Sequence, residues 1–303
     1  MTDSQNIYIV SRDAAGTSTV ERAISESEIL RIPGEIGLRP STLFMFDRLV
    51  FVEGPTDEAV LSEFAGSLNI DLSSKNIGFV RMGGASNTSY FASESTMDLL
   101  SRRQVPMIFV IDRDEKDTEE LGKISNKLGP RAKFHVLERR ELENYLLIPE
   151  AIQRLIAEKR ASTAQRDAEL PTPAVITEAA NEAALSLKDR VVSLRVARML
   201  LKPVYLERAS GADGLAKIES ALSELEARRE KFKEQADAIS NQIYRDYDQV
   251  ALRVAPGSEI LDLTMKKFGL SYQKERDAAR LASFIPPERV PEEIRMLLRQ
   301  IAG

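Results

Sequence analysis

Acidic side chains stand at three points in the first half of the chain where an apolar run ends. Glu53 closes the run RLVFVEG, Asp112 and Asp114 close VPMIFVIDRDE, and Glu138 closes KFHVLE. Residues two apart on an extended chain point to one side, so Asp112 and Asp114 are expected to share a direction. Gathered carboxylates repel one another unless cations neutralise them, and hard oxygen ligands select Mg²⁺, Mn²⁺ or Ca²⁺ over zinc. The pattern therefore predicts a metal site suited to phosphoryl chemistry.

Each acid taken singly also has a structural explanation. An acid after a strand is commonly a helix N-cap, which applies to Asp57 in GPTDEA and to Asp114. The acids between Glu138 and Glu143 also fit an exposed helix start, where negative charge complements the helix dipole. The metal-site interpretation is favoured because acidic strand ends recur three times in one stretch of alternating strands and helices.

Strand-like and helix-like segments alternate between residues 47 and 148, which we expect to form one domain, 47–149. The expected strands are RLVFVEG, IGFVRMGG, VPMIFVIDRDE and KFHVLE. The expected helices are PTDEAVLSEFAGSL, TSYFASESTMDLLSRR, EELGKISNKLG and one that begins in RRELENYLLIPEAIQRLI. Such alternation predicts an α/β fold with a parallel sheet flanked by helices, and a site beyond the carboxyl ends of the strands.

The rest of the chain is expected to form three further parts. Residues 1–46 hold one strand-like run, NIYIV, followed by loops, and resemble the tail of something larger. Residues 150–250 lack strand signals and are rich in Ala, Glu, Lys and Arg, which predicts an all-α accessory domain. Residues 251–303 end in the helical segment VPEEIRMLLRQIAG and are expected to complete the catalytic region.

The all-α part contains an apolar repeat whose spacing alternates between three and four. Its members are Leu215, Ile218, Leu222, Leu225, Phe232, Ala236, Ile239 and Ile243, interrupted by Arg229. The repeat indicates either an amphipathic helix packed on its own domain or a protruding arm that dimerises.

Composition narrows the classes of function. The chain has 303 residues, of which 43% are hydrophobic and 29% charged, with no Cys and one His. The absence of Cys excludes disulfides, thiolate zinc sites and cysteine nucleophiles, and the single His135 argues against catalytic triads and multi-His metal sites. The net charge of −5 has the wrong sign for non-specific DNA coating, although metal-binding acids would account for part of it. Without a signal peptide or a long apolar run, we expect a cytoplasmic protein with no membrane partner.

Four segments of the chain resemble, in the same order, the Toprim domain of the overcoming lysogenization defect (OLD) family of nucleases. They are FVEGPTDEAVL, VRMGGASN, FVIDRDE and LERRELENYLL. Glu53 matches the Toprim glutamate, and Asp112 with Asp114 matches its DxD pair. The features similar to the OLD branch are Glu53–Asp57, Gly83 and Gly84 with Asn87, and Glu138–Leu146.

This resemblance implies a Mg²⁺-dependent endonuclease that hydrolyses DNA phosphodiester bonds with two metals, for which Mn²⁺ or Ca²⁺ can substitute. The implied metal ligands are Glu53, Asp57, Asp112, Asp114, Glu138 and Glu143, of which Glu53 and Asp112 would be catalytic. The implied points of close backbone approach are Gly54, Gly83, Gly84 and Asn87.

The charge-stabilising lysine of the family is not matched. The chain has Gly257-Ser258 where a Gly-Lys pair would supply this lysine. Lys266 and Lys267 follow on the next helical turns and are the candidates for that role, although a solvated lysine pair explains them as well.

OLD proteins carry an ABC-type ATPase ahead of the Toprim domain, and this chain has no G-x-x-x-x-G-K-S/T phosphate loop. We therefore expect residues 1–46 to be a remnant of such a region, no ATP hydrolysis by the chain itself, and an ATPase domain or helicase as a partner. A homodimer and a role in phage defence or DNA repair fit the family. Two alternatives stay open: other Toprim chemistry, such as a topoisomerase using Tyr145 or Tyr205, and a non-catalytic or ATPase-dependent DNA-binding or regulatory module.

Overall fold

The computed structural model describes residues 8–12, 18–22, 46–83, 105–116, 121–122, 125, 132–161, 168–200 and 214–303. The chain divides into two compact units. The sheet unit comprises Met1–Ile111, Leu121–Val136 and Val290–Gly303, and the helical unit comprises Asp112–Glu120 and Leu137–Arg289. The helix expected over residues 88–103 lies outside the described residues, as does most of the helix expected over residues 119–129.

Four parallel strands form the main sheet of the sheet unit. They are β3 (Arg48–Val52), β4 (Ile77–Arg81), β5 (Met107–Ile111) and β6 (Ala132–Val136), in the order β4-β3-β5-β6. The predicted α/β fold with a parallel sheet is thus confirmed. Leu49, Val50 and Phe51 are each at most 2% exposed, so both faces of β3 are covered, which explains its unbroken apolar run.

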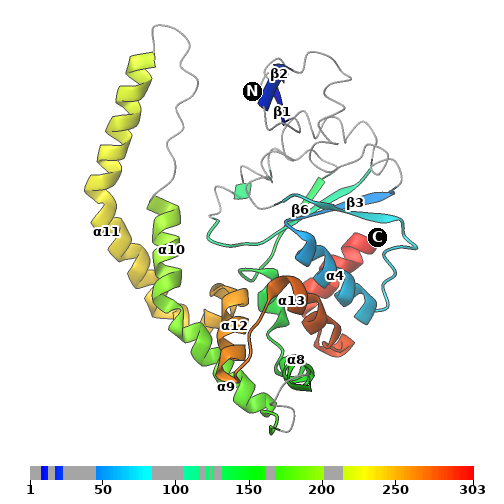
Figure 1. The fold of residues 1–303 in the computed structure, drawn as a ribbon. Coiled ribbons are helices and arrows are strands. Elements are labelled where there is room, and N and C mark those ends of the chain that lie inside the picture. The colour runs from blue at the N-terminus through cyan, green and yellow to red at the C-terminus, as the bar shows by residue number, and fades with distance from the viewer. Residues whose placement is uncertain are drawn as a thin grey trace. The chain divides into compact units, whose positions relative to one another are not determined.

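Two helices of the sheet unit, α4 (Pro55–Ser67) and α14 (Glu292–Ala302), pack against each other (Figure 1). Pro55 occupies the first turn of α4, where its missing N–H costs no hydrogen bond. The Nη1 atom of Arg48 donates to the carbonyl oxygens of Gln300, at 3.1 Å, and Ile301, which ties the last turn of α14 to β3. A separate antiparallel hairpin is formed by β1 (Tyr8–Arg12) and β2 (Ser18–Arg22).

The described residues of the helical unit contain helices and no strand, as the composition of 150–250 predicts. Its α-helices are α8 (Pro149–Ala161), α9 (Pro173–Ser186), α10 (Lys188–Leu200), α11 (Gly214–Val254), α12 (Gly257–Lys267) and α13 (Lys274–Ser283). Two 3-10 helices, η3 (Leu142–Leu146) and η4 (Pro287–Arg289), complete it. Among the described residues, no helix combines the length and the apolar character needed to cross a membrane.

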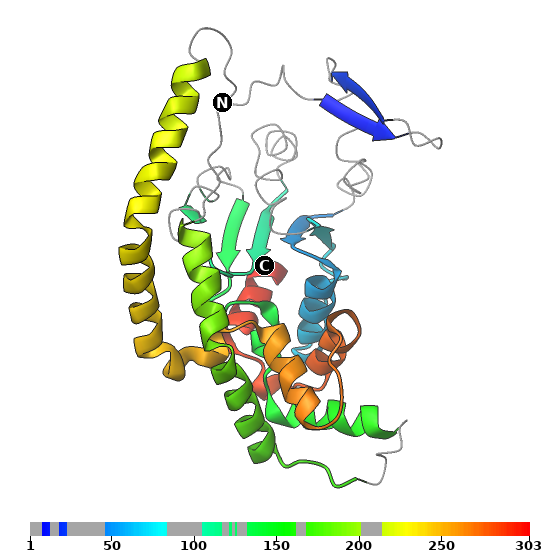
Figure 2. The same cartoon turned by 60° about the vertical axis from the view of Figure 1, so that its left-hand side comes forward.

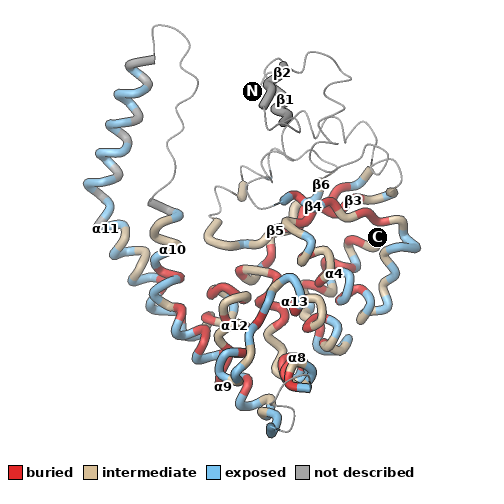
Figure 3. The backbone as a smooth tube through the Cα atoms, in the orientation of Figure 1, coloured by how far each residue is buried: buried red, intermediate tan, exposed pale blue. Residues whose placement is uncertain are grey.

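The apolar repeat of the sequence lies on α11, a single helix of 41 residues that runs beside α10 (Figures 1 and 2). Its C-terminal half is packed on its own unit, because Ile243 and Tyr247 belong to a buried cluster with Val192. Its N-terminal half exposes Leu222 and Phe232 by 55% and 44% (Figure 3). The packed interpretation thus describes one half of the helix, and dimerisation through the other half stays a prediction.

The segment RRELENYLLIPEAIQRLI does not form one continuous helix. Residues Leu142–Leu146 form the 3-10 turn η3, and α8 begins only at Pro149. Proline disfavours a helical backbone at the residue before it and fits the first position of a helix, so Pro149 separates the two elements. As a result, Glu141 and Glu143 lie in a tight turn rather than along a helix face.

Candidate functional site

The turn after β3 holds the first group of predicted ligands, within the sheet unit. Glu53 directly follows the strand, and Gly54 is the N-cap of α4. The Asp57 side chain is buried, and its Oδ2 accepts a 2.8 Å hydrogen bond from the Gly54 backbone N–H. Asp57 therefore has the capping role that the sequence allowed, while its carboxylate is held beside the end of β3. Among the described residues, a Cβ on Gly54 would meet only this carboxylate, at 3.9 Å, so these residues leave space for a side chain at the turn.

The DxD loop, residues 112–116, directly follows β5 and belongs to the helical unit. Asp112 Oδ1 accepts a hydrogen bond from the Leu142 backbone N–H at 3.1 Å. Asp114 adopts a left-handed backbone with φ of 44°, which Asp tolerates better than most residues, and its N–H donates to the Arg140 carbonyl at 3.0 Å. Lys116 completes the loop: its side chain is only 5% exposed, and its Nζ lies 2.7 Å from Asp114 Oδ2.

Arg140 connects the DxD loop to the segment around η3. Its side chain is 9% exposed and forms ion pairs with Glu115 and, at 3.3 Å, with Glu141. Its backbone N–H donates to the Arg253 carbonyl at 2.8 Å, at the end of α11. A buried guanidinium is stable only with such partners, so Arg140 fixes three segments of the helical unit relative to one another.

The segment around η3 also binds the start of α12. Ser258 donates to Glu141 Oε2 from its backbone N–H, at 3.3 Å, and from its hydroxyl, at 3.2 Å. The Asn144 side chain donates to the carbonyl oxygens of Leu252 and Ala255, at 2.8 and 2.9 Å. The segment LERRELENYLL, which resembles the OLD family, is therefore packed directly against the start of α12.

Glu143 is the most buried of the predicted ligands, with 1% of the residue exposed. Its Oε1 lies 2.7 Å from Lys274 Nζ, and its Oε2 is buried without a hydrogen-bond partner among the described residues. Burial raises the pKa of the Glu143 carboxyl, and the Lys274 ammonium opposes this rise. Burial also raises the pKa of the nearby Tyr272, whose hydroxyl is a second buried group without a partner in the described part of the chain.

The remaining predicted residues are spread more widely. Glu138 is exposed, and its Oε2 lies 3.7 Å from Arg253 Nη2. Lys266 and Lys267 are exposed in the last turn of α12, where they pair with Asp262, at 2.6 Å, and Glu182. Gly83 has a φ of 75°, a conformation that favours glycine. Gly84 and Asn87 lie outside the described residues.

The donor set fits a hard divalent cation, because all six predicted ligands are carboxylates. Lys116 is an independent sign of this fit, since its ammonium supplies positive charge to Asp114 where a cation would otherwise do so. Within the described ranges, no three Asp, Glu or His side chains gather closely enough to hold a metal by themselves. Each unit contains only part of the predicted set: Glu53 and Asp57 belong to the sheet unit, and the other four belong to the helical unit.

Residues 44–114 match the family described as overcoming lysogenization defect protein-like, TOPRIM domain. The match includes β3, β4 and β5, with the acids Glu53, Asp57, Asp112 and Asp114. The chain carries an OLD-family Toprim domain. The match confirms the resemblance predicted from the sequence. It also supports a nucleic-acid-related role for this OLD-family Toprim domain.

Three solved structures of the C-terminal region of the Xanthomonas campestris pv. campestris OLD protein are also similar to the chain. For the mercury-phased structure the identity is 16%, the coverage is 86% of this chain and 96% of that one, and the TM-score is 0.34. The platinum-phased structure has 14% identity, coverage of 86% of this chain and 94% of that one, and a TM-score of 0.35. The iodine-phased structure has 15% identity, coverage of 86% and 95%, and a TM-score of 0.34. No curated protein matches the chain.

Two lysines that contact predicted ligands, Lys116 and Lys274, are not among the residues predicted from the sequence, and a third residue, Arg140, has a role that the sequence does not indicate. Lys116 follows the DxD pair in DRDEK, and a lysine two residues after an acid was a usable signal. Arg140, one of the arginines near the site that could contact phosphate, instead pairs with Glu115 and binds the Arg253 carbonyl, which no local pattern indicates. Lys274 lies 131 residues beyond Glu143 in the sequence, so only the fold shows their contact.

Proposed function

We propose that the chain is a Mg²⁺-dependent endodeoxyribonuclease that hydrolyses DNA phosphodiester bonds by a two-metal mechanism. The observation that carries the proposal is that Glu53 and Asp112 directly follow β3 and β5, which are neighbouring parallel strands. Carboxyl ends of parallel strands meet at one edge of a sheet, where α/β proteins hold their sites. The OLD-family Toprim match over the same strands supports this assignment.

Glu53, Asp57, Asp112 and Asp114 would hold the metals, and Glu138 or Glu143 would be a further ligand. When bound, Mg²⁺ or Mn²⁺ supplies an activated water and neutralises charge on the phosphate oxygens. The protein holds the carboxylates in place: the Gly54 N–H orients Asp57, and the Leu142 N–H orients Asp112. Lys116 neutralises Asp114, which keeps the loop ordered before a metal arrives.

Lys266 and Lys267 remain the proposed source of positive charge toward the leaving oxygen, by resemblance to the family. Both would have to release their partners, Asp262 and Glu182, to reach a substrate. Gly83, Gly84 and Asn87 would form the backbone approach after β4. We further propose a cytoplasmic homodimer that works with an ATPase domain or helicase in phage defence or DNA repair.

The alternative function is a non-catalytic or ATPase-dependent DNA-binding or regulatory module. A topoisomerase that uses Tyr145 is disfavoured, because this residue is 1% exposed and its hydroxyl accepts a hydrogen bond from the Arg139 N–H. Tyr205 lies outside the described residues.

Cleavage of supercoiled plasmid by the wild-type chain and by Asp112→Asn tests the proposal. Asparagine keeps the oxygen that accepts the Leu142 N–H and removes only the negative charge, so folding should be preserved. We expect metal-dependent nicking or linearisation by the wild type, and a loss of roughly 100-fold or more in Asp112→Asn, as for a disrupted metal site.

Glu63→Gln is the matched control, because Glu63 is an exposed acid on α4 of the same Toprim domain. It should cleave like the wild type. If the folded wild-type chain cuts nothing with Mg²⁺ or Mn²⁺, or if Asp112→Asn cuts equally well, autonomous catalysis is refuted and the DNA-binding module becomes the better explanation.

A further inference from the structure

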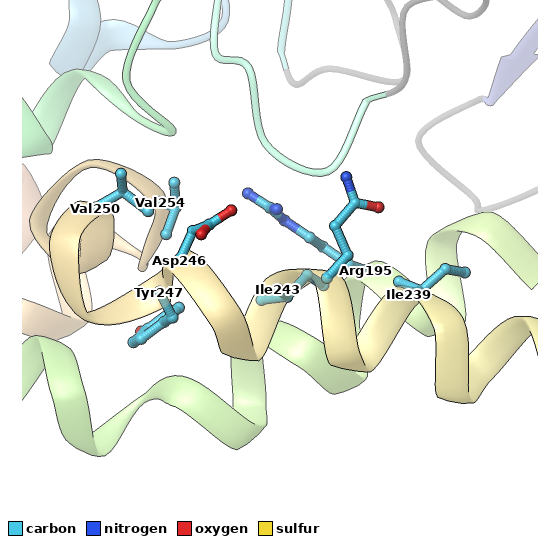
Figure 4. Close-up of a pocket in the computed structure, with 8 residues that line it drawn as sticks. Arg195, Ile239, Ile243, Asp246, Tyr247, Val250 and Val254 are labelled. Atoms are coloured by element: carbon cyan, nitrogen blue, oxygen red, sulfur yellow. The ribbon is translucent and has the colours of Figure 1, made fainter.

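A pocket of about 230 Å³ lies within the helical unit, along the packed half of α11 (Figure 4). One wall is an apolar stripe at helical spacing that includes Ile239, Ile243, Val250 and Val254. Arg195 of α10 reaches into the pocket beside this stripe. The pocket therefore combines an apolar wall with one guanidinium group, on Arg195, and one carboxylate, on Asp246.

Arg195 lacks the partners that the other arginines around it have. It is partly buried, and among the described residues it has no hydrogen bond and no ion pair. By contrast, Arg140 is paired with Glu115 and Glu141, and Arg190 on the same helix is paired with Glu259 at 2.7 Å. Burial lowers the pKa of Arg195, and the neighbouring Arg140 guanidinium lowers it further. A partly desolvated guanidinium without an acceptor in the described part of the chain is stabilised when it binds an anion.

The shape and chemistry of the pocket narrow the class of that anion. A guanidinium presents a planar fork of donors that suits phosphate or carboxylate oxygens. The apolar stripe requires that the anion carry a body able to pack against aliphatic side chains. The volume is below the roughly 300–1,000 Å³ of pockets for drug-sized ligands, so one ring system with one phosphate is an appropriate size. Asp246 at the same pocket has no ion pair with Arg195 and offers an acceptor to hydroxyl or amino groups.

The pocket adjoins the segments that hold the DxD loop. The Arg140 backbone N–H donates to the carbonyl of Arg253, whose neighbour Val254 lines the pocket. The Arg140 carbonyl accepts from Asp114, and its side chain binds Glu115. Arg253 and Arg140 thus connect a wall of the pocket to the loop proposed to bind metal, and the pocket and the loop both belong to the helical unit.

We propose that this pocket is a binding site for a nucleoside phosphate, with the phosphate on Arg195 and the base or sugar against the α11 stripe. The phosphate comes either from a free nucleotide or from a nucleic-acid strand. In the second case the site holds a nucleotide next to the one being cut, and that assignment rests on the proposed nuclease function.

Binding measured in EDTA tests this site without any dependence on cleavage. The probes are a 5′-labelled single-stranded DNA 20-mer, followed by fluorescence anisotropy, and dTMP, followed by calorimetry. We expect Arg195→Gln to weaken binding by about tenfold or more, since a bidentate phosphate contact is lost. Arg190→Gln, which removes the same charge from an exposed position of α10, should change binding by less than about twofold.

Two further measurements distinguish loss of the binding site from unfolding and from binding elsewhere on the protein. Arg195→Gln should not lower the thermal unfolding midpoint of the ligand-free protein, because the cation it removes has no partner to lose. Val250→Phe, which fills the pocket and keeps Arg195, should weaken binding as well. A folded Val250→Phe with unchanged binding would refute the pocket as the location.

The two probes distinguish the sources of the phosphate. Weaker binding of the 20-mer in Arg195→Gln supports the strand, and weaker binding of dTMP alone supports a free nucleotide. Unchanged binding of both probes, or an equal loss in Arg190→Gln, overturns the site. Because no metal is present, this result stands whether or not the wild-type chain cuts plasmid. Failure of the nuclease proposal would remove only the assignment of the site to a nucleotide next to the one being cut.

Discussion

Glu143 is a buried carboxylate, and its burial disfavours its ionised form. The residue is 1% exposed, its only described cationic partner is Lys274, and one of its oxygens has no hydrogen-bond partner among the described residues. Removing a carboxylate from water favours its neutral form, which is why burial raises the pKa of Glu143 despite the lysine. In the absence of metal, the ionised side chain therefore lowers the stability of the helical unit.

This conflict predicts a specific pH dependence of stability. The folded-state pKa of Glu143 lies above its ordinary value of 4.5, so the folded state binds the proton more tightly than the unfolded state. The free energy of unfolding should then fall as the pH rises from 4.5 through the folded-state pKa. Glu143→Gln cannot ionise and should lose this fall, so it should be at least as stable as the wild type at pH 8.

Urea unfolding in EDTA at a series of pH values measures the effect. The Lys274 side chain is 39% exposed, so water can solvate it once Glu143 is neutral. Glu63→Gln removes an exposed carboxylate and should keep the wild-type pH profile. If Glu143→Gln shows the same decline as the wild type, another group causes it.

At the scale of elements, Gly257 lies at a close approach of α12 to η3. A Cβ added to Gly257 would lie 2.5 Å from the Asn144 backbone nitrogen and 2.8 Å from the Glu143 carbonyl carbon. These are backbone atoms and cannot move aside as a flexible side chain would. The contact holds the Glu141–Asn144 turn against the end of α11, where Asn144 binds the Ala255 carbonyl.

Gly257→Ala is therefore expected to destabilise the helical unit by about 1–3 kcal/mol, the usual cost of inserting a methyl group into a packed contact. Gly66→Ala is the control, because a Cβ on this helical glycine meets nothing within 4 Å. It should stabilise α4 by about 0.5–1 kcal/mol. Chemical denaturation followed by circular dichroism measures both, and a neutral Gly257→Ala would show that η3 and α12 are not in contact in solution.

The sequence predicts the elements where local signals suffice. Unbroken apolar runs locate β3 and β5 because both faces of these strands are buried. The helix expected to begin in RRELENYLLIPEAIQRLI starts only at Pro149, because the residues before it form the separate turn η3. The exposure of Phe232 and the burial of Ile243 could not be distinguished, because the repeat is the same along α11 while its packing partners are not.

The candidate site, like the fold, has features that local sequence signals predict and features that only tertiary packing determines. The spacing of Asp112 and Asp114 after an apolar run indicates a carboxylate loop, and the Toprim match covers it. The hydrogen bonds that orient this loop come from Leu142 and Arg140, which are separated from it by residues without any local pattern. Their positions depend on tertiary packing, which no spacing within the DxD segment reports.

At the scale of the whole molecule, the two units are interleaved in the sequence. The chain changes unit after Ile111, Glu120, Val136 and Arg289, so neither unit is a continuous stretch. The last stretch contributes α14, whose Ile294, Leu297, Leu298 and Ile301 are each at most 1% exposed. The C-terminal helix is thus part of the core of the sheet unit, although 153 residues separate Val136 from Val290.

Removal of residues 290–303 should therefore unfold the sheet unit and spare the helical unit. Burial of four aliphatic side chains is worth roughly 6–12 kcal/mol, which is comparable with the whole stability of a domain. Hydrogen exchange followed by mass spectrometry should show β3 and β5 losing protection while α9 and the packed half of α11 keep it. Met296→Ala, at a position of α14 that is 56% exposed, should leave exchange unchanged. Simultaneous loss of protection in α9 would instead mean that the two units unfold as one body.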